Sequence, residues 1–205
     1  MPTATPGTAT RILDIAEHLV QVHGFNGFSY ADIATELEIR KASVHHHFAT
    51  KADLGARLIE RYRERFAGAL AEIDASTTDA GPALERYVHI YGAALRDDRM
   101  CLCGMLAAEI TALPRALRNA LRRFFDENET WLARVLERGR RAGSLAFTGK
   151  APAHARLILS ALEGAMLVAR SYGDVARFEA GAALLLAGLG VNVRRRVRAR
   201  KPARR

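Results

Sequence analysis

Apolar residues recur at intervals of three and four positions along most of the chain, which is the spacing that places side chains on one face of an α-helix. The first such stretch begins near Thr10, and Gly24 is well placed to end it before a short connection. No stretch is typical of a β-strand, so the pattern predicts an all-α protein. The apolar face of the first helix consists of Ile12, Ile15, Ala16 and Leu19.

Two short helices are predicted next. Ser29, followed three positions later by Asp32, is a capping signature for the second helix, which ends near Leu37. After a three-residue turn, Val44 and Phe48 lie four positions apart and give a third helix one inward face. Three short helices with a tight turn between the second and third form the geometry that places a helix in the DNA major groove. The N-terminal segment therefore predicts a helix-turn-helix.

A longer helix follows this motif. Thr50 can cap it together with Asp53, and its apolar positions continue to about Ala75, a length that can connect two domains. A break over residues 76–82 then precedes five more helical patterns, which brings the expected total to about nine helices. The later patterns cover residues 83–96, 101–111, 115–142, 151–171 and 175–193.

Hydrogen-bond donors gather at the start and on the outward face of the predicted third helix, where they can reach phosphates and base edges. Ser29 and Tyr30 are placed to contact phosphates through their hydroxyls, although Ser29 can also serve only as an N-cap. The consecutive histidines at 45–47 predict no metal site, because successive helical residues point about 100° apart. The candidate donors on the third helix are Arg40, Lys41, Ser43, His45 and His46.

The run from Gly24 to Leu54 resembles the helix-turn-helix of the TetR/AcrR family of transcriptional regulators. Two positions depart from the family pattern. Glu38 stands where the family usually has a glycine in the turn, at a cost of about 1 kcal/mol if the backbone there is left-handed. His45 stands where the family usually has a tyrosine, and it keeps a donor role. The resemblance implies that Lys51 holds a further phosphate. The matching residues are Gly24, Ser29, Ile33, Ala34, Lys41, Ser43, His47, Phe48, Lys51 and Leu54.

This resemblance also implies a function. Members of the family are DNA-binding regulators, usually repressors, that bind a pseudo-palindromic operator on double-stranded DNA as homodimers and are released by a small-molecule effector. The helices after residue 49 would bind the effector and pair across a two-fold axis, and no cofactor is implied. The chain then divides into a flexible arm, a helix-turn-helix DNA-binding domain, a ligand-binding and dimerisation domain, and a basic tail, at residues 1–9, 10–49, 50–193 and 194–205.

Charge changes this picture only at the C-terminus. The chain has 205 residues, 49% of them hydrophobic, which supports a substantial buried core. Of its formal net charge of +9, eight positive residues and no acidic ones fall within 194–205, which leaves +1 for the rest. This tail could attract phosphates without reading sequence, or it could only aid solubility. Without a long apolar run or a signal-like N-terminus, the expected location is the cytoplasm, with no membrane partner.

Small and apolar residues dominate the last two predicted helices and exceed what one helix face can bury. Small side chains let helices approach closely, so a four-helix dimer seam is expected, with a monomeric core as the alternative. Glu163 and Arg170 interrupt the apolar pattern and could serve dimer or ligand contacts. The small and apolar residues include Ala161, Leu162, Gly164, Ala165, Leu167, Val168, Ala182, Ala183, Leu184, Leu185 and Leu186.

The only two cysteines, Cys101 and Cys103, are too few for a disulfide framework and fit a reducing compartment. The segment from Met100 to Glu109 resembles a TetR/AcrR subgroup in which a Cys-Leu pair precedes a small-residue helix. At the start of a helix the dipole can lower a thiol pKa, so Cys101, with Cys103, is a candidate sensor of electrophiles or oxidants. The alternative is two buried thiols that act as small hydrophobic residues.

Bulky side chains at helical spacing are candidates for an effector pocket, although such residues are more often core. No phosphate-binding glycine loop, zinc spacing or Ser/His/Asp grouping indicates an enzyme. A helical protein-interaction adaptor without specific DNA binding is the alternative function. The candidate ligand contacts are Tyr62, Phe66, Tyr87, Tyr91, Cys101, Met105, Phe124, Trp131 and Met166.

Overall fold

The structure is a computed structural model and describes residues 7–191, so the basic tail and most of the predicted arm lie outside the described residues. Within that range the chain forms nine α-helices, one short 3-10 helix and no strand, which confirms the all-α prediction. The helices are α1 (Thr8–His23), α2 (Tyr30–Glu36), α3 (Lys41–His47), α4 (Lys51–Ser76), α5 (Ala80–Arg96), α6 (Leu102–Ala108), η1 (Ile110–Ala112), α7 (Arg115–Arg141), α8 (Ala151–Ser171) and α9 (Val175–Ala187).

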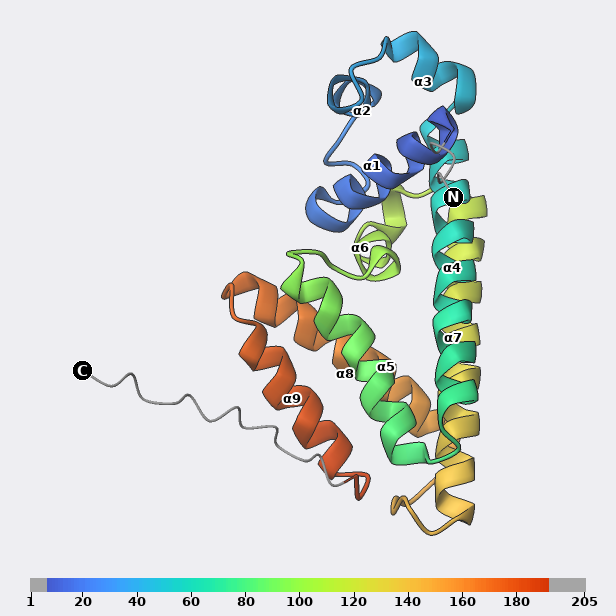
Figure 1. Cartoon of the computed structure of the whole chain (residues 1–205), viewed down its shortest axis with the longest axis vertical. Coiled ribbons are helices and arrows are strands. Elements are labelled where there is room, and N and C mark those ends of the chain that lie inside the picture. Colours follow the sequence, from blue (N-terminus) through green and yellow to red (C-terminus); the bar gives the residue numbers. More distant parts are fainter. Residues whose placement is uncertain (1–6, 192–205) are drawn as a thin grey trace, which may run out of the picture.

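Helices α1, α2 and α3 form a group at one end of an elongated molecule (Figure 1). The long helix α4 begins beside this group and runs along the molecule in contact with α7. Helices α5, α8 and α9 complete the other end, and α8 packs against both α7 and α9. Helix α6 lies between the two groups and contacts α1, α4 and α7. A change at α6 can therefore reach α1 through direct contacts.

Two capping boxes fix the starts of α2 and α4 as predicted. At α2 the backbone N–H of Ser29 donates to Asp32 Oδ2 at 2.6 Å, and the N–H of Ala31 donates to Ser29 Oγ at 3.2 Å. At α4 the N–H of Thr50 donates to Asp53 Oδ2 at 3.0 Å, and the N–H of Asp53 donates to Thr50 Oγ1 at 3.1 Å. These side chains satisfy backbone donors that have no partner within a helix.

The predicted helix ends hold with four differences. Helix α5 begins at Ala80, inside the predicted break and before the predicted start at residue 83, and α6 ends at Ala108, before the predicted end at residue 111. Helix α1 begins at Thr8, earlier than the predicted start near Thr10. Helix α9 ends at Ala187, so the prediction that this helix continues to residue 193 is wrong for residues 188–191. Residues 192–193 lie outside the described range. Gly190 explains the early end, because its φ of 82° is left-handed and cannot continue an α-helix. None of the helices described is long and apolar enough to cross a membrane.

Candidate nucleic-acid interface and regulatory cavity

Helix α3 presents its polar face to solvent at the end of the molecule (Figure 1). Val44 is buried against α1 and α2, and Phe48 is buried directly after the helix. Arg40 and Lys41 at its start are exposed, and within residues 7–191 neither forms an ion pair with a carboxylate. His45 and His46 are also exposed, whereas Ser43 is half-buried. This face therefore offers unneutralised positive charge and N–H donors to an anionic partner.

The turn between α2 and α3 contains a strained residue. Glu38 has a φ of 56°, in the left-handed region that favours glycine. The Glu38 N–H donates to the carbonyl of Thr35 at 3.2 Å, and the Ile39 N–H donates to the carbonyl of Ala34 at 3.0 Å. These bonds close the turn, and the left-handed φ of Glu38 meets the condition under which this position costs about 1 kcal/mol.

Tyr30 lies inside the N-terminal helical group, so the predicted phosphate contact through its hydroxyl must be corrected. The residue is 6% exposed, and its hydroxyl is buried without a hydrogen-bond partner among the described residues. Its ring packs edge-on against His45, with 4.7 Å between ring centroids. Burial raises the pKa of Tyr30 to about 12. Because Tyr30 belongs to the apolar stripe of α2, its ring packs inside the helical group and against His45.

Ser29 is exposed, but its hydroxyl is used within the cap. It accepts from the N–H of Ala31 and donates to Asp32 Oδ2 at 2.9 Å. The N-cap role is confirmed, and a phosphate contact by Ser29 stays a prediction.

Lys51 opens α4 and points into the connection between α1 and α2. Its ammonium group donates to the carbonyl of Phe28 and lies over the rings of Phe25 and Phe28, at 5.0 Å and 4.1 Å from their centroids. Burial lowers the pKa of Lys51. The side chain therefore ties α4 to this connection. The ammonium group has three N–H donors and the carbonyl uses one, so a phosphate contact by the other two remains a prediction.

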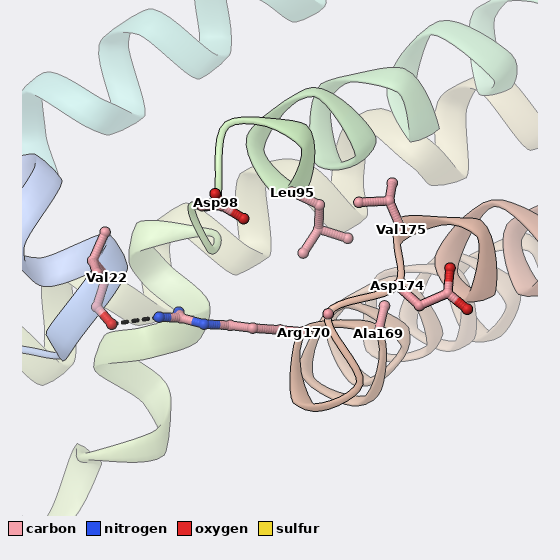
Figure 2. Close-up of a pocket in the computed structure, with 8 residues that line it drawn as sticks. Val22, Leu95, Asp98, Ala169, Arg170, Asp174 and Val175 are labelled. Carbon is pink, nitrogen blue, oxygen red and sulfur yellow. Dashed lines mark hydrogen bonds between the residues drawn. The ribbon is translucent and has the colours of Figure 1, made fainter.

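Arg170 joins α8 to the C-terminal end of α1 (Figure 2). Its guanidinium donates to the carbonyl of Gln21 at 3.0 Å and to the carbonyl of Val22 at a shorter distance. The last carbonyls of a helix have no partner within it and form the negative end of its dipole, so a cation there is stabilising. Arg170 also borders a cleft of about 310 Å³, together with Asp98 and Asp174. The side chain thus connects the C-terminal helices with the N-terminal group.

The segment around α6 is attached to the same end of α1. The N–H of Met100 donates to the carbonyl of Gln21 at 3.2 Å, and Gln21 Nε2 donates to the carbonyl of Met100 at 2.9 Å. Past the other end of α6, Glu109 Oε2 accepts from the N–H of Asn26 at 3.0 Å. Helix α6 is therefore fastened at both ends to α1 and to the turn that follows it.

A third attachment is an ion-pair cluster between α1 and α4. Glu17 has a side chain that is 6% exposed, and it accepts from Arg61 at 2.8 Å and from Arg65 at a shorter distance. Arg61 also pairs with Asp14 at 2.7 Å. Glu17 lies on the buried stripe of α1 with Leu13 and Val20, so only paired cations make its burial tolerable.

Most of the predicted ligand contacts form a closed aromatic core between α4, α5 and α7. Phe66 lies at its centre, 5.2 Å from Phe124 and 6.1 Å from Tyr87 between ring centroids. Tyr87 stacks on Trp131 at 5.4 Å, and its hydroxyl donates to Asn128 Oδ1 at 3.1 Å. These rings fill space against one another, so a ligand contact by any of them stays a prediction. Tyr62 and Tyr91 complete the cluster, Met166 is buried, and Met105 lies instead beside Arg170.

The two thiols are enclosed, and this corrects the expectation for Cys101. Cys101 is the N-cap of α6 and is 2% exposed, and Cys103 is fully buried. The hydroxyl of Tyr62 donates to Cys101 Sγ at 3.7 Å. Burial, and then the neighbouring Glu163 carboxylate, raise the pKa of Cys101 well above its ordinary value. The predicted lowering is wrong because these effects exceed the dipole of a seven-residue helix.

A separate cavity of about 380 Å³ lies between α6, α7 and α8. Glu163 of α8 forms part of its wall, and its Oε1 is buried without a hydrogen-bond partner among the described residues. Its Oε2 lies so close to Gly104 that a Cβ built there would be 2.2 Å away. Burial raises the pKa of Glu163 to about 7. The lining residues are Met100, Gly104, Ala107, Ala108, Phe125, Glu129, Leu159, Ser160, Glu163 and Leu167.

Comparison with known proteins identifies the family. A model of bacterial regulatory proteins of the tetR family matches residues 12–58, and a model of the C-terminal domain of LmrA/YxaF-like transcriptional regulators matches residues 82–183. The chain is similar to the crystal structure of a TetR family transcriptional regulator from Agrobacterium tumefaciens, with a TM-score of 0.85 and 38% identity over 88% of this chain and 96% of that chain. The chain belongs to the TetR family of transcriptional regulators.

Two curated relatives agree with this assignment. The transcriptional regulator AcuR of Cereibacter sphaeroides is 30% identical over 75% of this chain and 72% of its own length. The HTH-type transcriptional repressor NemR of Escherichia coli is 26% identical over 80% of this chain and 84% of its own length. The resemblance of the Gly24–Leu54 run to the TetR/AcrR helix-turn-helix is therefore confirmed. TetR-family regulators are generally transcription factors and not enzymes.

Three attachments between helices were not predicted from the sequence of this TetR-family chain. Glu109 was seen only as the end of a helix, and Arg170 was noted only as a charge in an apolar helix. Glu17 had a readable signal, because it follows Leu13 by four positions and precedes Val20 by three, on the stripe that faces the core. No local signal pairs Arg170 with Val22, since 148 positions separate them.

Proposed function

We propose that this TetR-family regulator is a repressor that binds a pseudo-palindromic operator as a homodimer and is released by a small-molecule effector. The outward face of α3 carries the proposal. Arg40 and Lys41 are exposed there, and neither is neutralised by a carboxylate of the described chain. Helix α3 would enter the major groove, with His45 and His46 placed to reach base edges or phosphates. The adaptor alternative would leave these cations without a partner.

Homodimerisation is supported by an unpartnered face on α8 and α9. Leu157 and Val168 of α8 are 56% and 53% exposed, and Leu184 of α9 is 75% exposed. Gly164 and Gly181 have open space beside them, so a second helix can approach closely at both positions. A monomeric core would instead bury these side chains within the chain. The two-fold symmetry of a dimer would set two α3 helices on successive major grooves.

Release by an effector needs a connection between the C-terminal helices and α1. Arg170 and Met100 supply it, because both bond to the carbonyl of Gln21 at the end of α1. A ligand that moves α6 or α8 would change the position of α1 and, through the shared core, of α3. The enclosed, protonated thiols favour a non-covalent effector over oxidation of Cys101 or Cys103.

Selection of binding sequences from a random DNA pool would test the operator proposal. We expect enrichment of one pseudo-palindromic sequence, with affinity that falls as salt rises. Lys41→Ala should weaken binding to it by at least about tenfold, as expected for loss of a contact at the groove. Lys150→Ala removes the same charge from the start of α8 and should have no effect. Failure to enrich any sequence would overturn the proposal.

Sedimentation equilibrium tests the dimer separately. The wild-type chain should sediment at twice its mass of 22.5 kDa, and Leu184→Glu, which places a charge on the proposed seam, should sediment as a monomer. Enrichment of single half-sites, together with a wild-type chain that sediments as a monomer, would support DNA binding and refute the homodimer.

A further inference from the structure

The cavity between α6, α7 and α8 combines an apolar wall with two carboxylates, of which one has no ion-pair partner in the described chain. Phe125, Leu159 and Leu167 supply apolar surface, and Glu129 and Glu163 supply the two carboxylates. Within residues 7–191, no Lys, Arg or His lines this cavity. Glu129 is paired outside the cavity with Arg156 at 3.3 Å, whereas Glu163 forms no ion pair within the described chain. A ligand that complements this wall needs a positive charge and an apolar body.

Glu163 is positioned to hold such a ligand. Its Oε1 is enclosed and forms no hydrogen bond within the described chain, and buried acceptors normally have a donor. Burial raises the pKa of Glu163, and a hydrogen bond from the Cys101 thiol, which also lies beside the carboxyl group, lowers it. The close approach of Oε2 to Gly104 fixes the carboxyl group against α6, where any larger residue would push it away. An N–H donor in the cavity would satisfy Oε1, and a charge-assisted bond to a carboxylate is stronger than a neutral one.

We infer that this cavity binds a small molecule that carries a protonated amine on an apolar body, with Glu163 as the anchor of the amine. The volume of about 380 Å³ falls in the lower part of the range for small-molecule sites. Phe125 lines the same cavity and adds aromatic surface for the apolar body. This inference rests on the proposed function, because it takes the C-terminal helices to bind the effector. The chemical class of that effector would be an amine with an apolar body.

The ionisation of Glu163 gives the binding a pH dependence. Burial raises its pKa to about 7, so the carboxylate form that attracts an amine increases as the pH rises through neutrality. Burial also raises the pKa of the neighbouring thiols and phenols, which stay neutral over this range, and Glu129 is the other carboxylate at the cavity. The groups that face Glu163 are Tyr62 from α4, Tyr87 and Tyr91 from α5, Cys101 and Cys103 from the start of α6, and Glu129 from α7.

Calorimetric titration of the full chain with three matched probes tests the inference. The probes are 4-phenylbutylamine, the neutral 4-phenylbutan-1-ol and the anionic 4-phenylbutanoate. We expect the amine to bind at least about tenfold more tightly than the alcohol, with a preference that grows from about pH 6 to about pH 8, and no binding of the carboxylate. Equal binding of amine and alcohol would overturn the amine class, and no binding of any probe would overturn the site.

Variants separate the anchor from the cavity. Glu163→Gln keeps the shape of the side chain and should reduce the preference for the amine to less than about threefold, with binding of the alcohol retained. Ala107→Phe fills the cavity and should abolish binding of both probes. Glu137→Gln removes a carboxylate elsewhere on α7 and should change neither. An amine preference that survives Glu163→Gln would refute the role of Glu163. Because these titrations contain no DNA, their failure leaves the operator proposal standing, and the converse also holds.

Discussion

Replacement of Arg170 by methionine should loosen the attachment of α1 to α8 without removing the apolar stem of the side chain. The guanidinium donates to the carbonyls of Gln21 and Val22, and methionine has a comparable length but no donor. After the change, the carbonyl of Gln21 keeps the N–H of Met100 at 3.2 Å, whereas that of Val22 loses its link to α8. The end of α1 would then keep its bonds to the α6 segment but lose its bonds to α8.

The expected magnitude follows from these two bonds. A hydrogen bond to a charged group contributes about 1.5–3 kcal/mol. Arg170 is half-buried, so solvent screens part of its charge, and the lower end of that range applies to each bond. Their joint loss therefore amounts to about 2–3 kcal/mol, which corresponds to roughly a 30- to 150-fold increase in local opening at the end of α1.

Amide hydrogen exchange measures this opening directly. In Arg170→Met, amides near the C-terminal end of α1 should exchange faster by that factor, and Arg170→Lys should fall between this variant and the wild type, since a lysine keeps the charge but not the planar fork. Arg156→Met is the matched control on α8, because the side chain of Arg156 is 69% exposed and pairs only with Glu129. A change in α1 of less than about threefold in Arg170→Met would refute the proposed attachment.

Four further changes test other parts of the molecule. Glu38→Gly should raise the free energy of unfolding by about 0.5–1 kcal/mol in urea denaturation, because relief of the left-handed strain exceeds the backbone entropy of glycine; an unchanged midpoint would contradict this. Glu17→Gln should lower the free energy of unfolding by about 2–3 kcal/mol. This loss is less than for a fully buried ion pair, because the arginines left behind reach solvent, and a smaller loss would mean that the ion-pair cluster contributes little to stability. The pKa of Glu163 is raised from its ordinary 4.5 to about 7, so the folded state binds this proton more tightly than the unfolded state. The free energy of unfolding should therefore fall as the pH rises from about 4.5 to about 7 and level off above, and Glu163→Gln should not show this pH dependence. Cys101 should react with iodoacetamide at least about a hundredfold more slowly in the folded protein than in urea, and rapid labelling of the folded chain would restore the reactive-thiol hypothesis.

The sequence predicted the helices well because the signals that begin and end them are local. Ser29 and Asp32 cap α2, and Thr50 and Asp53 cap α4, in each case within three residues. Such capping features depend on neighbouring residues alone and can be read without the tertiary structure. The left-handed backbone at Glu38 was suggested instead by the resemblance to the TetR/AcrR helix-turn-helix, in which a glycine usually stands at this position.

Roles that depend on burial were predicted less well. The hydroxyl of Tyr30 and the thiol of Cys101 were expected to be available, but the structure encloses both. Periodicity shows which face of a helix is apolar, but it does not show how deeply one polar atom on that face is covered. The sequence identified Glu163 and Arg170 as unusual charges, and only the packing of α8 against α6 and α1 shows what each one faces.

Glu163 and Arg170 lie seven residues apart on α8, close to two helical turns, so both project from the same side of the helix. Met100 has a comparable double position, because its side chain lines the cavity and its backbone bonds to Gln21. An amine bound at Glu163 would therefore touch both elements that hold the end of α1. If occupancy of the cavity alters that attachment, 4-phenylbutylamine should change amide exchange at the end of α1 in the wild type, and Arg170→Met should reduce this change. Linkage sets the size of this change, because the factor by which the amine shifts the opening of α1 equals the ratio of its affinities for the closed and the open state. Equal exchange at the end of α1 with and without saturating amine would show that the cavity and α1 are not coupled.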